Sequence, residues 1–119
     1  MPLINLIGFV DTPGDSGGVA ISGTHACLAD GYFGLQLIDI TNPENPQIVG
    51  NVDTPDNARS VATSGSHAYV ADRRSGLQVI DITSPANPQI VGELNIPEWV
   101  YNVTTYGTHV YVSVSTGLM

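Results

Sequence analysis

Residues 34–41 read Gly-Leu-Gln-Leu-Ile-Asp-Ile-Thr, and residues 76–83, 42 positions later, read Gly-Leu-Gln-Val-Ile-Asp-Ile-Thr. A third, shorter copy begins at Gly92. Self-similarity at a period of this length is typical of proteins built from stacked units, each of which cannot bury its apolar face alone. The sequence therefore predicts a repeat protein with about 2.7 units of 42 residues, counted from Gly8.

Each unit contains four short segments rich in β-branched and aromatic residues, separated by turn residues, which is the pattern of β-strands. In the second unit these segments are residues 59–64, 67–72, 77–83 and 89–94. Two prolines separate the third segment from the fourth and prevent continued ladder pairing. No window of the chain has a helical period. We therefore predict an all-β chain whose units are β-propeller blades of four antiparallel strands.

Three phrases of the second unit carry a family resemblance: His-Ala-Tyr-Val-Ala-Asp at 67–72, Gly-Leu-Gln-Val-Ile-Asp-Ile at 76–82 and Pro-Ala-Asn-Pro-Gln-Ile-Val-Gly at 85–92. Together they resemble the LVIVD-repeat family of propeller-like proteins, and the resemblance covers nearly the whole chain. It implies a propeller-like fold and an extracellular or cell-envelope setting, although no secretory signal is visible at the N-terminus. The resemblance brings no catalytic motif to these residues.

The repeat also predicts how one partial propeller of residues 1–119 is divided. Residues 1–11 are expected to hold a fourth-type strand of a preceding blade, 12–53 the first blade, 54–95 the second, and 96–119 an incomplete third blade with only its first two strands. These assignments amount to eleven strands.

A propeller ring needs roughly four to eight blades, so one copy of this chain does not close a ring. Apolar blade faces and strand edges left in water favour association. We therefore expect a ring completed by homo-oligomerisation, with a homodimer that exchanges its N-terminal strand favoured over a trimer. The alternative is that the chain is a fragment of a longer LVIVD-repeat surface protein.

The chain is acidic, with eleven Asp and Glu residues, three arginines, no lysine and a formal net charge of −8. Nucleic acids and anionic membranes attract basic patches, so both are disfavoured as partners. No apolar run is long enough for a membrane span. The single cysteine, Cys27, has tyrosines as its counterparts in the other units and is expected to fill space in a strand.

The copies differ mainly in two kinds of loop. One kind precedes the first strand of a unit, at residues 14–18, 56–60 and 98–102, and the other joins the second and third strands, at residues 31–33 and 73–75. In an up-and-down blade both kinds fall on the same face, while the turns of the opposite face are nearly unchanged. Variable loops on one rim are typical of a binding surface. The candidate binding residues are Asp15, Tyr32, Phe33, Asp56, Arg59, Arg73, Arg74, Glu98, Trp99 and Tyr101.

Catalytic and metal chemistry finds little support in the sequence. His25, His67 and His109 recur once per blade, too far apart to share a zinc ion with Zn–N bonds of about 2.0–2.1 Å. No nucleophile elbow, phosphate-binding loop or Cys/His cluster is present, so we predict no cofactor and no metal.

The recurring aspartates have a simpler explanation than catalysis. Asp30, Asp39, Asp72 and Asp81 lie at or near strand ends, where side-chain carboxylates cap turns. The sequence therefore favours a non-enzymatic scaffold or binding module whose rim holds a protein, peptide or glycan. The alternative is a propeller enzyme with acidic residues that converge at the axis.

Overall fold

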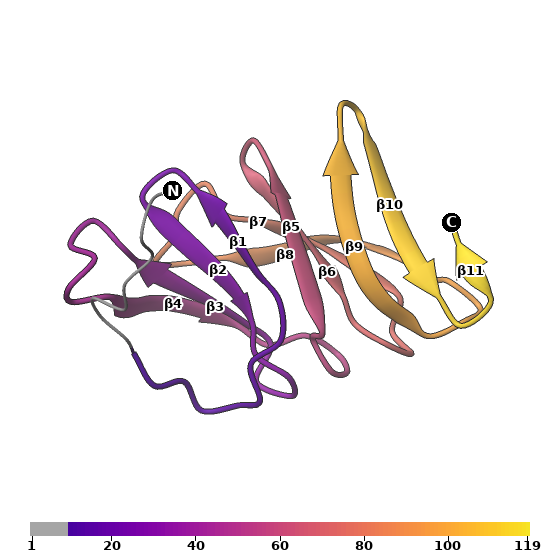
Figure 1. The fold of residues 1–119 in the computed structure, drawn as a ribbon, viewed down its shortest axis with the longest axis horizontal. Helices are drawn as coiled ribbons and strands as arrows, with labels where there is room; N and C mark the ends of the chain where they lie inside the picture. Colours follow the sequence, from indigo (N-terminus) through magenta and orange to yellow (C-terminus); the bar gives the residue numbers. More distant parts are fainter. Residues whose placement is uncertain (1–9) are drawn as a thin grey trace, which may run out of the picture.

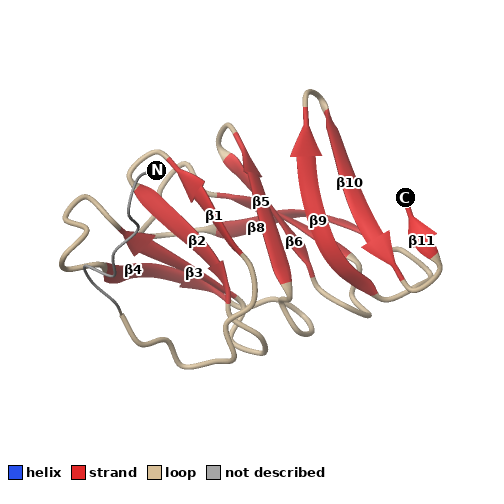
Figure 2. Cartoon of the chain, viewed as in Figure 1, coloured by secondary structure: helices blue, strands red, loops and turns tan. Residues whose placement is uncertain are grey.

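The computed structural model describes residues 10–119, and its strands form three antiparallel sheets that follow one another in chain order (Figure 1). The first sheet consists of β1 (Val19–Ser22), β2 (His25–Ala29), β3 (Leu35–Asp39) and β4 (Gln47–Val52). The second consists of β5 (Ser60–Ser64), β6 (His67–Ala71), β7 (Leu77–Asp81) and β8 (Gln89–Leu94). The third consists of β9 (Val100–Tyr106), β10 (His109–Val114) and β11 (Gly117–Leu118). The described residues contain no helix, so the all-β prediction is confirmed (Figure 2).

The third sheet corrects the prediction of two strands for the last unit. The two-residue strand β11 folds back on β10 and pairs Gly117 with Val114 and Leu118 with Ser113. Gly117 has a φ of +143°, a conformation that glycine adopts readily, and it stands at the tight turn that makes this pairing possible. The strand expected within residues 1–11 lies almost wholly outside the described residues.

Three strands of the second sheet, β5 to β7, are slightly shorter than the sequence predicted, and hydrogen bonds at the ends of β6 and β7 explain why those two stop early. The backbone N–H of Asp72 donates to the carbonyl of Gly76 and so closes a turn directly after β6. At the end of β7, the Asp81 carboxylate accepts a 2.8 Å hydrogen bond from the backbone N–H of Thr83. In both places an aspartate starts the turn, so the ladder stops there.

Two apolar cores lie between the sheets, one at each seam. The core between the first and second sheets includes Cys27, Leu35, Leu37, Val61, Val70 and Ile80. The core between the second and third sheets includes Ala62, Leu77, Val100, Val103, Val112 and Val114. Stacking therefore buries faces that single sheets would expose, as a repeat architecture requires.

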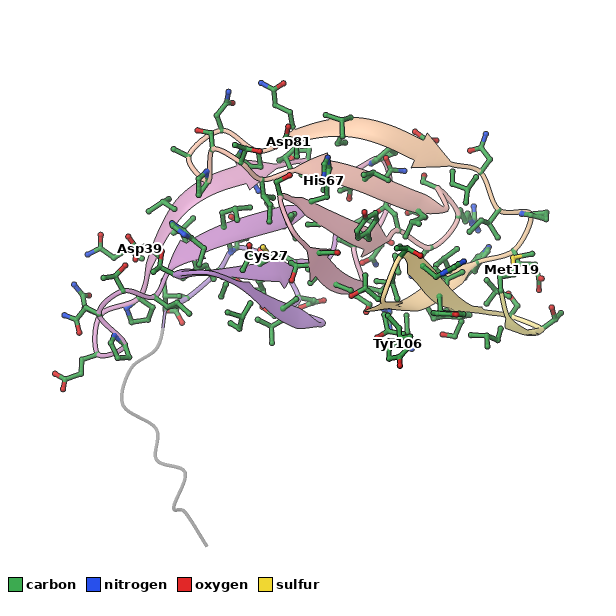
Figure 3. The ribbon with its side chains drawn as sticks, turned by 90° about the horizontal axis from the view of Figure 1, so that it is seen from above. Cys27, Asp39, His67, Asp81, Tyr106 and Met119 are labelled. Atoms are coloured by element: carbon green, nitrogen blue, oxygen red, sulfur yellow. The ribbon has the colours of Figure 1, made fainter. Side chains whose placement is uncertain are left out.

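Cys27 is fully buried in the first of these cores, where Figure 3 labels it between the first two sheets. Burial raises the pKa of its thiol to about 11, because the thiolate would lose its water shell. The prediction of a space-filling cysteine is confirmed by this position.

A hydrogen bond between neighbouring inner strands recurs at each seam. The hydroxyl of Thr63 donates to the carbonyl of Ile21 at 2.8 Å, and the hydroxyl of Thr105 donates to the carbonyl of Thr63 at 3.2 Å. The three positions are 42 residues apart, so the same contact links the first sheet to the second and the second to the third. The sequence repeat is thus a repeat of tertiary contacts as well.

The turns that join the first two strands of each sheet lie along the upper edge in Figure 1. Their glycines, Gly23, Gly65 and Gly107, have φ values of +58°, +58° and +60°. Because this left-handed conformation favours glycine, one residue type is kept in all three copies.

Candidate functional site

The two kinds of variable loop meet on the opposite edge, which we call the loop rim: the loops before β1, β5 and β9 and the turns after β2 and β6. Gly31 and Ala58 exchange two backbone hydrogen bonds of 3.0 and 2.9 Å across the first seam. Arg73 and Val100, each 42 residues further on, exchange bonds of 3.1 and 3.0 Å across the second seam. The prediction that both loop kinds share one face is confirmed by these bridges.

Two buried aspartates accept hydrogen bonds from the loops before β1 and β5 and so fix these loops. The Asp72 carboxylate accepts a 2.7 Å hydrogen bond from the Thr54 hydroxyl and a 3.0 Å bond from the backbone N–H of Asp56. Asp30 likewise accepts bonds from the Thr12 hydroxyl, at 2.8 Å, and from a backbone N–H of the same loop, at 3.1 Å. Both aspartates are fully buried and cap turns, as predicted. Burial raises the pKa of the Asp72 carboxyl, and these hydrogen bonds oppose that rise.

Three side chains from two sheets gather at the second seam. The guanidinium carbon of Arg73 lies 4.6 Å from the ring centroid of Trp99, and that of Arg74 lies 4.9 Å from it. Both distances are within the range of a cation–π interaction. We call Arg73, Arg74 and Trp99 the arginine–tryptophan cluster. With Tyr32 and Asp56 it lines a hollow of about 220 Å³.

The backbone of Arg73 is unusual. Its φ is +50°, and it is the one residue other than glycine with a positive φ in the part of the chain that the structure describes. In the first sheet the same place is held by Gly31, with a φ of +64°. A non-glycine residue in this region costs on the order of 1 kcal/mol, and such outliers concentrate at functional sites. Arg73 therefore occupies a place where glycine would be easier to accommodate.

Further predicted residues line two adjoining hollows. Tyr32 and Phe33, which are 70% and 48% exposed, line a hollow together with Asp15 and Asn57. Arg59 lines the next hollow, which Asp15 and Asn57 share. The sequence did not single out Asn57, although it is the counterpart of Asp15 at a distance of 42 residues and lies in a variable loop. That equivalence was the signal that could have identified it.

Two predicted residues have other surroundings. The carboxylate of Glu98 accepts a 2.8 Å hydrogen bond from the Thr116 hydroxyl, and Glu98 lines none of these hollows. Tyr101 lies within β9, half-buried, with its ring centroid 6.4 Å from that of Trp99. The structure thus brings together Tyr32 and the arginine–tryptophan cluster, and it leaves Glu98 and Tyr101 beside the site.

The recurring histidines and their cross-strand aspartates belong to the opposite edge of the sheets. Nδ1 of His67 lies 3.4 Å from the hydroxyl of Ser66, and the residue pairs directly with Asp81 on β7. Hydrogen bonds from the side chain and the backbone of Thr83 hold the pKa of the Asp81 carboxyl below its usual range.

No group of three or more potential metal ligands occurs within residues 10–119. Over the same residues, no helix has the length and apolar character needed to cross a bilayer.

Three stacked antiparallel sheets, with constant turns on one edge and variable loops on the other, define a propeller-like repeat protein. The profile of the LVIVD repeat matches residues 13–54 and 55–96, and the chain belongs to this family. Among solved structures, the chain is similar to the computationally designed Ika4 protein, with a TM-score of 0.55 and 9% sequence identity over 99% of this chain and 97% of that one. At this identity the likeness concerns the fold alone. No curated protein matches the chain.

Proposed function

We propose that this chain is a non-enzymatic scaffold and binding module that holds a protein, peptide or glycan partner on its loop rim. The arginine–tryptophan cluster carries the proposal, because its three side chains come from two loops that differ between copies and meet at one exposed edge. Tryptophan and arginine are also the residue types most enriched at binding hot spots.

The construction of the rim supports a binding role. The seam bridges recur 42 residues apart at both seams, and buried aspartates support the loops before β1 and β5. Side chains on the rim loops vary while the seam bridges stay the same. A rigid frame that presents variable side chains is how many repeat proteins form binding surfaces.

Trp99 is the only tryptophan of the chain, so its fluorescence reports on the cluster directly. A panel of immobilised peptides and oligosaccharides, followed by titration of Trp99 emission with each binder, tests the proposal. We expect Arg74→Ala to weaken binding by at least about ten-fold, the change that about 1.4 kcal/mol produces. Glu44→Ala, at an exposed turn on the opposite edge of the first sheet, is the control. Retention on the immobilised panel that persists unchanged in Arg74→Ala and Trp99→Phe would remove the rim from the proposal.

Assembly with further copies of the chain is the second part of the proposal. On the outer face of the first sheet, Val19 and Ile21 are 60% and 56% exposed, whereas Val61, the counterpart of Val19 in the second sheet, is 6% exposed beneath the first sheet. A second copy that covers this face would bury the same apolar surface that the internal seam buries. At about 25 cal/mol per Å² of apolar surface, such burial favours a closed homo-oligomer, and we favour a dimer.

Light scattering tests the assembly. A dimer has twice the 12.5 kDa mass of the chain. Ile21→Glu places a charge on the exposed face and is expected to shift the dimer toward monomer, whereas Tyr32→Glu, on the loop rim, leaves the mass unchanged. A cooperatively folded wild-type monomer at low micromolar concentration would contradict this part and leave the rim proposal standing.

A further inference from the structure

All three basic side chains of the chain lie along the loop rim. Arg59 lines the first of the three hollows and the arginine–tryptophan cluster lines the last. Asp15 and Asn57 are shared by the first and middle hollows, and Tyr32 is shared by the middle and last hollows. The hollows therefore follow one another in a row along the rim, and we call this row the groove; in a chain of net charge −8 it has arginine at both ends.

The guanidinium groups retain hydrogen-bonding capacity. The guanidinium carbons of Arg73 and Arg74 lie within cation–π distance of the Trp99 ring, and a cation–π contact does not itself use the guanidinium N–H groups. The Nε atom of Arg73 is buried and has no hydrogen-bond partner among the described residues. The Asp56 carboxylate nearby accepts its 3.0 Å bond from the backbone N–H of Arg74, not from the guanidinium group. Planar guanidinium groups with free edges match carboxylates in bidentate pairs.

The middle of the groove is different in character. Tyr32 and Phe33 expose aromatic surface there, beside the polar side chains of Asp15 and Asn57. Each hollow has a volume of about 220–270 Å³, below the roughly 300–1,000 Å³ of typical small-molecule sites. A row of small hollows fits successive side chains of an extended chain better than one compact ligand.

We propose that this groove binds an extended acidic peptide, with one carboxylate on Arg73 and Arg74, apolar side chains over Tyr32 and Phe33, and a second carboxylate at Arg59. This inference rests on the proposed binding function of the rim and specifies its partner class. The positive φ of Arg73 supports this inference independently. Its counterpart Gly31 shows that glycine fits this backbone position, and yet the second unit has an arginine there. Recognition of acidic motifs by arginine clusters is a common mode of peptide binding.

Selection from a library of displayed random octapeptides on the immobilised full chain tests the proposal. We expect enriched sequences to carry Asp or Glu at two positions separated by apolar residues. Selection on Arg59→Gln is expected to lose one acidic preference, and selection on Arg73→Gly with Arg74→Gln the other. Arg73→Gly suits the backbone of that position, so the variant is expected to remain folded. Glu44→Ala, on the opposite edge, is the control and is expected to keep both preferences.

Synthetic versions of the selected peptides then separate the outcomes by Trp99 fluorescence. Replacement of Glu by Gln in the peptide is expected to weaken binding at least about ten-fold, in line with the loss of a charge-assisted hydrogen bond. Selected peptides without acidic residues, or insensitive to the arginine variants, would overturn the inference. Quenching of Trp99 by oligogalacturonate, with no peptide selected, would overturn the peptide assignment but support the rim as a binding site. If neither peptides nor oligosaccharides bind, both proposals fail.

Discussion

The Thr54 hydroxyl donates a 2.7 Å hydrogen bond to the buried carboxylate of Asp72, and the positions 42 residues after this pair are Ile96 and Val114. Val114 is buried in the core between the second and third sheets, and Ile96 is partly buried and packs against this core. The third unit thus replaces both partners of the polar pair with apolar residues. This agrees with the high cost of a buried polar group that has lost its partner.

The pair should behave as a coupled unit. Thr54→Ile alone leaves Asp72 without its hydroxyl donor and is expected to lower the free energy of unfolding by about 1–3 kcal/mol. Thr54→Ile with Asp72→Val is expected to lose less than the sum of the single changes, by at least about 1 kcal/mol. Urea unfolding of the four proteins measures this difference. Strict additivity would show that the pair is not coupled.

The equivalent pair of the first sheet offers a control. Asp30 also accepts hydrogen bonds from Ser16, at 3.2 Å, and from Gln36, at 3.2 Å. Thr12→Ile with Asp30→Val leaves the buried Gln36 amide without its Asp30 acceptor, so the double change is expected to recover less stability there than at Asp72.

Stability should also depend on pH through Asp72. Burial raises the pKa of this carboxyl, so the folded state binds its proton more tightly than the unfolded chain does. Its contribution to stability is therefore fully present below the unfolded value of about 3.9 and is lost as pH rises through the folded pKa. We expect the melting temperature of the double variant, Thr54→Ile with Asp72→Val, to rise relative to that of the wild type as the pH increases from about 3 to about 7. A melting temperature that instead falls relative to the wild type over this range would contradict the upward pKa shift of Asp72.

Gly50 and Gly92 are equivalent by the repeat but have different neighbours. A Cβ atom at Gly50 would collide with the carbonyl oxygen of Pro85 in the next sheet, whereas one at Gly92 would meet only the Val79 side chain at 3.5 Å. We expect Gly50→Ala to cost about 1–3 kcal/mol of unfolding free energy and Gly92→Ala no more than about 0.5 kcal/mol. Chemical denaturation of both variants measures these losses. Equal losses would show that Gly50 does not pack closely against the Pro85 carbonyl oxygen.

Because the backbone of Arg73 is left-handed, we expect glycine to be favoured over alanine at that position. Arg73→Gly is expected to be more stable than Arg73→Ala by about 1 kcal/mol, because glycine adopts positive φ without the Cβ clash. At Arg74, where φ is not positive, alanine is expected to be at least as stable as glycine. Thermal unfolding of the four variants gives the comparison. The same order at both positions would show that Arg73 is not strained.

Local signals allowed much of the fold to be predicted from the sequence. Turn glycines such as Gly65 and strand segments such as 89–94 are decided by a few adjacent residues, and the structure has them where the repeat placed them. The short strand β11 was missed because two residues are too few to show alternation. The face shared by the variable loops was also predictable, since strand order in an up-and-down sheet fixes it.

The sequence by itself determined the repeat, the strand class and the rim on which variable loops gather, because periodicity and turn chemistry depend on residues close in the chain. Only the tertiary structure decided which rim side chains meet. Arg73 and Arg74 reach Trp99 because the seam bridge between Arg73 and Val100 holds two loops of neighbouring sheets together. Glu98, one residue before Trp99, bonds instead to Thr116. Lateral packing of the sheets sets these contacts, and no spacing within one unit encodes them.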